Sequence, residues 1–238
     1  MSVVISEEGG TMASREREAG AARESGARKP PRKGLLEKRQ AIERGARKVF
    51  GREGYTRASI DAIAAEAGVS TRTIYNHFAD KEELFRSVFL ASAASVTADS
   101  TDLFDRHFRH FGKAGDVEAD LLALARDWVG QSSQHPEHFA LVRQIITEGP
   151  RMPADVIEEW QRVGPRAVRA DLAERLRGLA DQGLFDIDDA DAAARHLSLL
   201  IGGITLESFF GAVRVRAAEV EKSVASGVWA FLKLYGPS

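Results

Sequence analysis

The spacing of apolar side chains constrains this chain most, because from residue 35 to residue 235 they recur three or four positions apart. That spacing places them on one face of an α-helix, and no segment alternates apolar and polar residues convincingly, as a half-buried strand does. Prolines and glycines interrupt the pattern at His135-Pro136, at 149–153 and at Gly183. We therefore predict an all-α fold of about nine helices. They are expected before Gly54, over 59–67 and 70–78, from Asp80 onward, and over 116–133, 137–148, 154–181, 189–210 and 217–235, while 98–114 is ambiguous.

The segment 59–78 carries the local signals of a helix-turn-helix. Ser59 is a favourable N-cap for a first helix with one apolar face, and Gly68 is able to adopt the left-handed conformation that ends it. Ser70 caps a second, short helix in which Ile74 and Phe78 face inward. A short exposed helix with hydrogen-bonding groups and few acids fits the major groove of DNA. Its outward side chains are Thr71, Arg72, Thr73, Tyr75, Asn76 and His77.

The charge is distributed unevenly, although the whole chain carries a formal net charge of only −2. Residues 28–86 have a net charge of +6, whereas residues 87–238 have a net charge of −6. A basic segment beside an acidic remainder is the pattern expected when one part of a protein meets a polyanion. The charge pattern therefore favours a nucleic-acid partner for the segment that holds the helix-turn-helix.

The first 33 residues hold almost no large apolar side chain after Ile5, so we predict a disordered tail over 1–33. Its basic arm, residues 28–33, either enters a DNA minor groove or only keeps the tail soluble. The chain has no cysteine, which removes disulfides and cysteine-based zinc sites and suits a reducing compartment. Apolar runs are too short to span a bilayer, and the start lacks the features of a signal peptide. We expect a cytoplasmic protein with no membrane partner.

The region 36–86 resembles the DNA-binding domain of the TetR/AcrR family of repressors. The resemblance implies a helix-turn-helix domain over 34–80 and a larger helical ligand-binding and dimerisation domain over 81–238. It also implies a homodimer on palindromic double-stranded operator DNA, released when a small molecule displaces the fourth helix. The segment 138–165 is similar to one subtype of the family's C-terminal domain. The matching residues are Val49-Phe50-Gly51-Arg52-Glu53-Gly54-Tyr55, Thr56, Ser59, Ile60-Asp61-Ala62-Ile63-Ala64, Ala67-Gly68-Val69-Ser70, Thr73-Ile74-Tyr75-Asn76-His77-Phe78 and Asp80-Lys81-Glu82-Glu83-Leu84.

The same resemblance assigns DNA contacts to particular side chains. Tyr75 and His77 correspond to contacts with phosphates and base edges, although Tyr75 has the alternative of packing on the first helix. Arg72, flanked by Thr71 and Thr73, contacts either a guanine or a phosphate. Thr56 and Ser59 are candidate phosphate contacts from the second helix, although for Ser59 the role of a cap alone is favoured. The charge of Lys81 opposes the positive end of the fourth helix, which suggests a phosphate partner, with a solvated lysine as the alternative.

The last two predicted helices carry broad apolar stripes, one with Leu197 and Ile201 and the other with Val224 and Phe231. Packing within the chain explains part of these stripes, and the resemblance implies that the helix pair also meets its copy. An apolar or amphipathic ligand is expected in a cavity before these helices. Each aromatic candidate is either a ligand contact or plain core, and Arg143 binds an anionic ligand or pairs with an acid such as Glu148. The candidates are Phe85, Phe89, Phe104, Phe108, Trp128, Phe139, Arg143, Trp160 and Phe185.

Other functions have weaker support from the residues. The pairs His107/His110 and His135/His138 have a spacing compatible with a metal, but no third ligand is fixed, so we expect neither metal nor cofactor. The chain lacks a Gly-rich phosphate loop, a GxSxG elbow and an HExxH motif, so we expect no enzyme. The alternative is a DNA-binding regulator without ligand sensing, either an activator or an architectural protein.

Overall fold

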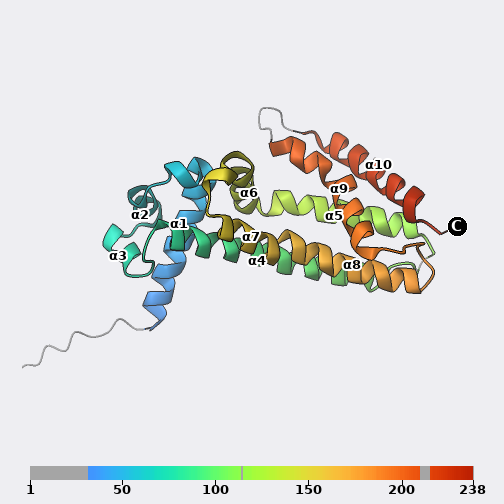
Figure 1. Ribbon diagram of the computed structural model, residues 1–238, viewed down its shortest axis with the longest axis horizontal. Coiled ribbons are helices and arrows are strands. Elements are labelled where there is room, and N and C mark those ends of the chain that lie inside the picture. The colour runs from blue at the N-terminus through green and yellow to red at the C-terminus, as the bar shows by residue number, and fades with distance from the viewer. Residues whose placement is uncertain (1–31, 114, 210–214, 238) are drawn as a thin grey trace, which may run out of the picture.

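The computed structural model describes residues 32–113, 115–209 and 215–237, and it is helical throughout, with no strand in these ranges (Figure 1). The all-α prediction is therefore confirmed. Three helices form one end of an elongated molecule: α1 (Arg32–Arg57), α2 (Ile60–Ala67) and α3 (Thr71–Tyr75). The rest is a bundle of α4 (Lys81–Phe108), α5 (Val117–Gln134), α6 (Pro136–Glu148), α7 (Ala154–Val163), α8 (Pro165–Asp181), α9 (Ala190–Phe209) and α10 (Ala217–Tyr235), with a 3₁₀ turn at Gly149–Arg151.

The helix boundaries differ from the predictions at three places. α4 continues through the ambiguous segment as far as Phe108. The helix predicted over 154–181 is two helices, because Gly164 leaves the helical conformation (φ −99°, ψ −105°). Pro165 begins α8, where its missing backbone N–H costs no hydrogen bond because the first residues of a helix have no intrahelical acceptor. α1 runs to Arg57, but Gly54 inside it has φ +83°, so the chain turns at the glycine where the helix was predicted to stop.

The predicted disordered tail lies almost wholly outside the described residues. α1 begins at Arg32, so the last two positions of the predicted tail are helical in their backbone. The basic arm is otherwise outside the described part of the chain.

One hydrophobic core joins the three N-terminal helices to the bundle. It contains Phe50 of α1, Ile63 of α2 and Ile74 of α3, and it continues into Phe85 and Phe89 of α4. Leu141 of α6 and Val156 of α7 close the same core on the bundle side. The end of the molecule that carries α2 and α3 is thus packed directly on α4, α6 and α7.

A second core fills the far half of the bundle, between α4, α5, α8, α9 and α10. The apolar stripes predicted for a dimer interface lie mainly here: Leu197, Ile201, Val224 and Phe231 are buried inside the chain. They are buried because α9 and α10 pack against each other and against α5 and α8. Among the side chains of these helices that the structure describes, the large apolar ones that remain exposed are Leu199, Trp229 and Leu234.

Within the ranges that the structure describes, every helix is too short or too polar to be a candidate membrane span.

Candidate functional site

The turn between α2 and α3 is built by caps. The Ser59 hydroxyl accepts a hydrogen bond from the Ala62 amide at 3.1 Å, and the Ser70 hydroxyl accepts one from the Thr73 amide at 3.1 Å. Between them Gly68 has φ +66°, the left-handed conformation that ends α2. These bonds satisfy amides that a helix start leaves without partners, so the sequence itself fixes the angle between α2 and α3.

The outer face of α3 presents polar side chains to solvent. Arg72, Tyr75 and Asn76 are exposed, and Tyr75 keeps 55% of its surface accessible. Ile74 is buried beneath them, so α3 packs on its apolar side only. Tyr75 therefore points outward instead of packing into the core under the first helix.

Several predicted DNA contacts already have partners within the chain. The Thr73 hydroxyl lies 2.8 Å from the Ser70 hydroxyl, so it shares the capping arrangement, and Ser59 likewise acts as a cap. Thr71 and His77 are half-buried, whereas the Thr56 side chain is exposed. Thr71 and Thr73 lie on α3, His77 follows it, Ser59 precedes α2 and Thr56 lies near the end of α1. Their contacts with DNA stay predictions.

Lys81 occupies the first turn of α4, and its ammonium group is turned toward the chain. Its Nζ donates hydrogen bonds to the Tyr55 carbonyl at 3.0 Å and to the Ala58 carbonyl at 3.2 Å, and lies 4.8 Å from the centre of the Tyr55 ring. These hydrogen bonds hold the connection between α1 and α2 against the start of α4. These two carbonyls use two of the three donors of the ammonium group, and a contact between Lys81 and a phosphate stays a prediction.

The C-terminal end of α6 holds the same connection from the other side. The Glu148 carboxylate accepts a hydrogen bond from the Thr56 amide at 3.0 Å, and Gln144 donates to the Gly51 carbonyl at 3.2 Å. Glu148 is buried, and it lies so close to Gly54 that a Cβ there would overlap its carboxylate. Only a glycine leaves room for this acid at the turn.

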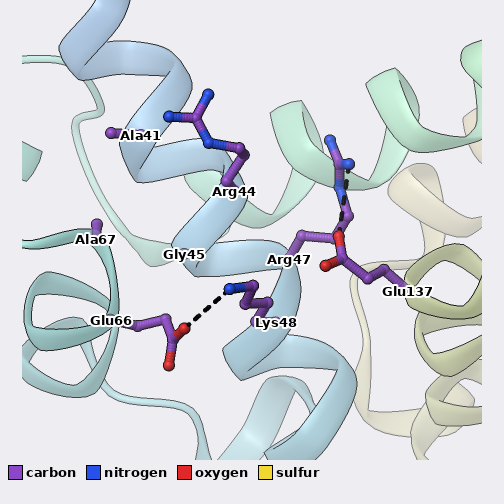
Figure 2. A pocket seen from close by; sticks show the side chains of 8 residues that line it. All are labelled: Ala41, Arg44, Gly45, Arg47, Lys48, Glu66, Ala67 and Glu137. Atoms are coloured by element: carbon purple, nitrogen blue, oxygen red, sulfur yellow. Dashed lines mark hydrogen bonds and ion pairs between the residues drawn. The ribbon is translucent and has the colours of Figure 1, made fainter.

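A cluster of charged residues ties α1 to both neighbours (Figure 2). Lys48 extends toward Glu66 of α2, with 3.3 Å between Nζ and the carboxylate, whereas Arg47 lies 3.7 Å from Glu137 of α6. Gly45, earlier on α1, faces α2, and an added Cβ there would come within 2.9 Å of Ala67. α1 and α2 thus pack with almost no space between their backbones.

The bundle contains a cavity of about 270 Å³, which is lined by residues of α4, α5, α6, α7, α8 and α9. Trp128, Phe139 and Trp160, three of the predicted ligand contacts, line it. Its polar side chains had not been predicted as ligand contacts: Thr97, Ser100, Gln131, His138, Arg169 and Ser198. Among these, Ser100 and Gln131 are buried and paired with each other, and no periodicity in the sequence identifies which helices face each other.

The other predicted ligand contacts lie elsewhere. Phe85, Phe89 and Phe104 are fully buried core residues and do not line this cavity, because each is enclosed by other aromatic rings. Phe108 and Phe185 pack in the second core. Arg143 is exposed on α6 and is not among the residues that line this cavity. Trp160 is connected to this aromatic series, since its ring stacks on Phe89 at 5.5 Å.

The four histidines with metal-like spacing take separate environments. His107 pairs with Asp127 at 2.8 Å, His135 with Asp99 at 3.2 Å, and His110 is exposed. His138 is buried with its Nδ1 3.1 Å from the Ser92 hydroxyl, and burial, reinforced by the positive charges of His135 and Arg47, lowers its pKa to about 4. Among the described residues, no three acidic or histidine side chains gather in a metal-binding group.

Comparisons with known proteins match both halves of the chain. Residues 42–88 match the family described as bacterial regulatory proteins, TetR family, and residues 119–237 match the C-terminal domain of AefR-like transcriptional repressors. A crystal structure described as a TetR-family transcriptional regulator of Mesorhizobium loti MAFF303099 is 31% identical, with a TM-score of 0.75 over 85% of this chain and 98% of that one. The chain belongs to the TetR family.

Two further relatives agree with this assignment. The solved structure of the flavonoid-responsive regulator FrrA is 28% identical, with a TM-score of 0.63 over 85% of this chain and 98% of its own. An HTH-type transcriptional regulator of Staphylococcus aureus (strain MRSA252) is 31% identical over 114 residues, which are 48% of this chain and 56% of that protein. The chain thus matches little more than half the length of this Staphylococcus protein. The TetR resemblance of residues 36–86 is confirmed.

Proposed function

We propose that this TetR-family chain is a dimeric transcriptional repressor that binds a palindromic operator and leaves it when a small molecule occupies the cavity. One observation carries the proposal: α6 contacts both the cavity and the connection between α1 and α2. Phe139 and Val142 of α6 line the cavity, and Gln144 and Glu148 at its C-terminal end hold the connection between α1 and α2. A change in the position of α6 therefore moves the helices that present α3.

The DNA part of the proposal rests on α3. Its exposed Arg72, Tyr75 and Asn76 stand on a helix fixed by caps at both sides of the turn. One five-residue helix reads few base pairs, so a two-fold pair of them on successive major grooves is needed for a specific site. The matched C-terminal domain of AefR-like repressors supports repression as the direction of control.

A second copy of the chain is the partner that we infer for α9 and α10. Leu199, Trp229 and Leu234 have 67%, 60% and 62% of their surface exposed, although the same helices bury a core on their other side. Large exposed apolar groups on adjacent helices mark an interaction surface. The dimer interface thus uses these outer residues, and the inner stripes hold the chain together.

Ligand release requires only that the small molecule binds one conformation better than the other. A tenfold difference in affinity corresponds to about 1.4 kcal/mol, so a modest shift in packing around the cavity changes operator occupancy substantially. α4 provides a second path, because Ser100 and Thr97 line the cavity while Asp80 and Lys81 begin the helix beside α3. The name of FrrA, a flavonoid-responsive regulator, supports an aromatic ligand for the similar cavity here.

The experiment is to select bound fragments from host genomic DNA and measure affinity for them with and without small molecules. The proposal expects a discrete palindromic site whose affinity falls in the presence of at least one aromatic ligand. Broad, sequence-independent coverage would support an architectural protein instead. A discrete site that no ligand class affects would support a regulator without ligand sensing.

A further inference from the structure

The cavity among α4 to α9 has aromatic walls suited to a flat ligand. Trp128, Phe139 and Trp160 line it together with Val96, Val142 and Val168. Aromatic rings pack favourably against one another edge-to-face or offset, so a ring system is the natural occupant of such walls. A second cavity of about 260 Å³ shares Trp128, Phe139 and Val142 and extends toward Ile201 and Gly202 of α9.

Nearly all the hydroxyl and amide groups of the cavity are already paired. Ser100 donates to the Gln131 side chain at 2.8 Å, Thr97 donates to the Val163 carbonyl at 3.0 Å, and Ser198 donates to the Ala194 carbonyl at 2.7 Å. His138 is hydrogen-bonded to Ser92. These groups therefore do not need a hydrogen-bond partner from a ligand.

Trp160 and Arg169 carry donors without such partners. The indole Nε1 of Trp160 is buried and has no hydrogen-bond acceptor in the part of the chain that the structure describes. A buried donor of this kind is rare in folded proteins, because its desolvation is not compensated. Trp160 Nε1 also faces the space beside Gly164, where an added Cβ would lie 3.8 Å from it.

Arg169 of α8 lines the same cavity, and over the described ranges no carboxylate lies within ion-pair distance of it. Its charged neighbours are Arg166 and Arg195, and burial together with these two like charges lowers the pKa of Arg169. A partly buried arginine beside two other arginines is stabilised by an anion. The planar guanidinium group binds a carboxylate through two parallel hydrogen bonds.

We propose that the ligand of this cavity is an aromatic carboxylate, whose ring lies among Trp128, Phe139 and Trp160 and whose carboxylate pairs with Arg169 and accepts a hydrogen bond from Trp160 Nε1. Both unpaired groups are donors, so the ligand supplies acceptors, and the positive charge selects an anion over a neutral amide. This inference rests on the proposed ligand-responsive function and names the ligand class of that site.

The test compares two ligands of nearly identical shape, 1-naphthoate and 1-naphthamide, by calorimetry on the full chain. Wild type is expected to bind naphthoate at least tenfold more tightly than the amide. Arg169→Gln should reduce this preference to less than twofold, and Trp160→Phe should weaken naphthoate binding while it keeps an aromatic ring. Arg177→Gln is the matched control, because Arg177 lies on the same helix, is exposed and pairs with Glu174; it should bind both ligands as wild type does.

Equal affinity for the acid and the amide would overturn the proposal, as would the absence of binding by either. A thermal unfolding curve of each variant distinguishes lost binding from lost folding. Affinity for the selected DNA fragment is measured in the same samples. Naphthoate binding without DNA release would leave the ligand class intact and contradict ligand-controlled release. Release of the DNA by the amide alone would support ligand-controlled release and contradict the proposed ligand class.

Discussion

The backbone amide of Thr56 donates a hydrogen bond to the buried carboxylate of Glu148 at 3.0 Å, across 92 residues of sequence. Glu148 ends α6, where a negative charge opposes the helix dipole, so its position is explained by its partner and not by the helix. The bond joins the connection that precedes α2 to the helix that lines the cavity.

Removal of this link should destabilise the chain. Glu148→Ala leaves the Thr56 amide without an acceptor, which costs about 1–3 kcal/mol in the free energy of unfolding. Urea unfolding measures the change. Glu158→Ala is the control, because Glu158 is an exposed acid on α7, and it should change the free energy by less than about 0.5 kcal/mol. Equal effects of the two variants would contradict a specific role for Glu148.

The close packing of α1 on α2 predicts a cost for any side chain at position 45. Gly45→Ala places a Cβ within 2.9 Å of the Ala67 backbone, so α2 has to shift, and we expect a loss of about 1–3 kcal/mol in unfolding free energy. Gly34→Ala is the matched control in the same helix, since nothing lies within 4 Å of its added Cβ. It should be neutral or slightly stabilising in thermal unfolding. A neutral Gly45→Ala would show that the helices are further apart.

The free energy of unfolding should decrease as the pH is lowered, because His138 is buried in the folded chain. Its pKa is about 4 in the folded chain and 6.5 in the unfolded one, so between these values the unfolded chain binds more protons. The free energy of unfolding therefore decreases as pH falls from about 6.5 to about 4, by up to about 3 kcal/mol from this group. Urea unfolding at several pH values should show a weaker pH dependence in His138→Gln. His110→Gln, at an exposed histidine, should keep the wild-type dependence; identical curves for both variants would contradict the assignment.

Arg72 offers a way to separate base reading from phosphate binding. If Arg72 contacts a guanine, Arg72→Ala loses about 1–3 kcal/mol of discrimination at one base pair and tolerates other bases there. If it contacts a phosphate, affinity falls uniformly across sequences and the salt dependence decreases by about one unit of slope. Titration of point-substituted operators at two salt concentrations distinguishes these results. Unchanged affinity would place Arg72 outside the DNA interface.

The helix-turn-helix could be predicted because its signals are local. Ser59, Gly68 and Ser70 perform in the structure the capping and turning roles that their residue types indicate. The break at Gly164 was not predicted, because the apolar pattern continues across 154–181, although the Gly164-Pro165 pair is itself a local signal for a break. Local chemistry therefore specifies both the caps and this break, and the error came from giving the apolar pattern more weight than the dipeptide.

The residues that line the cavity were predicted only in part, because the sequence does not show which helices leave a gap. Trp128, Phe139 and Trp160 were identified as aromatics in the right region, but Phe85 and Phe89 have the same character and are core. Whether an aromatic ring faces a cavity depends on which helices leave a gap. Arg169 was missed because its lack of a nearby carboxylate is a property of three-dimensional packing.

The exposed face of α3 gives the most direct test of the account, through footprinting and affinity measurements on a selected operator. Wild type should protect two half-sites about one helical turn apart and bind them at least about 10³-fold more tightly than unrelated DNA. Tyr75→Ala should lose this protection and at least tenfold in affinity while its unfolding curve stays unchanged, because Tyr75 is 55% exposed. Wild-type protection and affinity in Tyr75→Ala, or continuous protection of any DNA by wild type, would contradict the account.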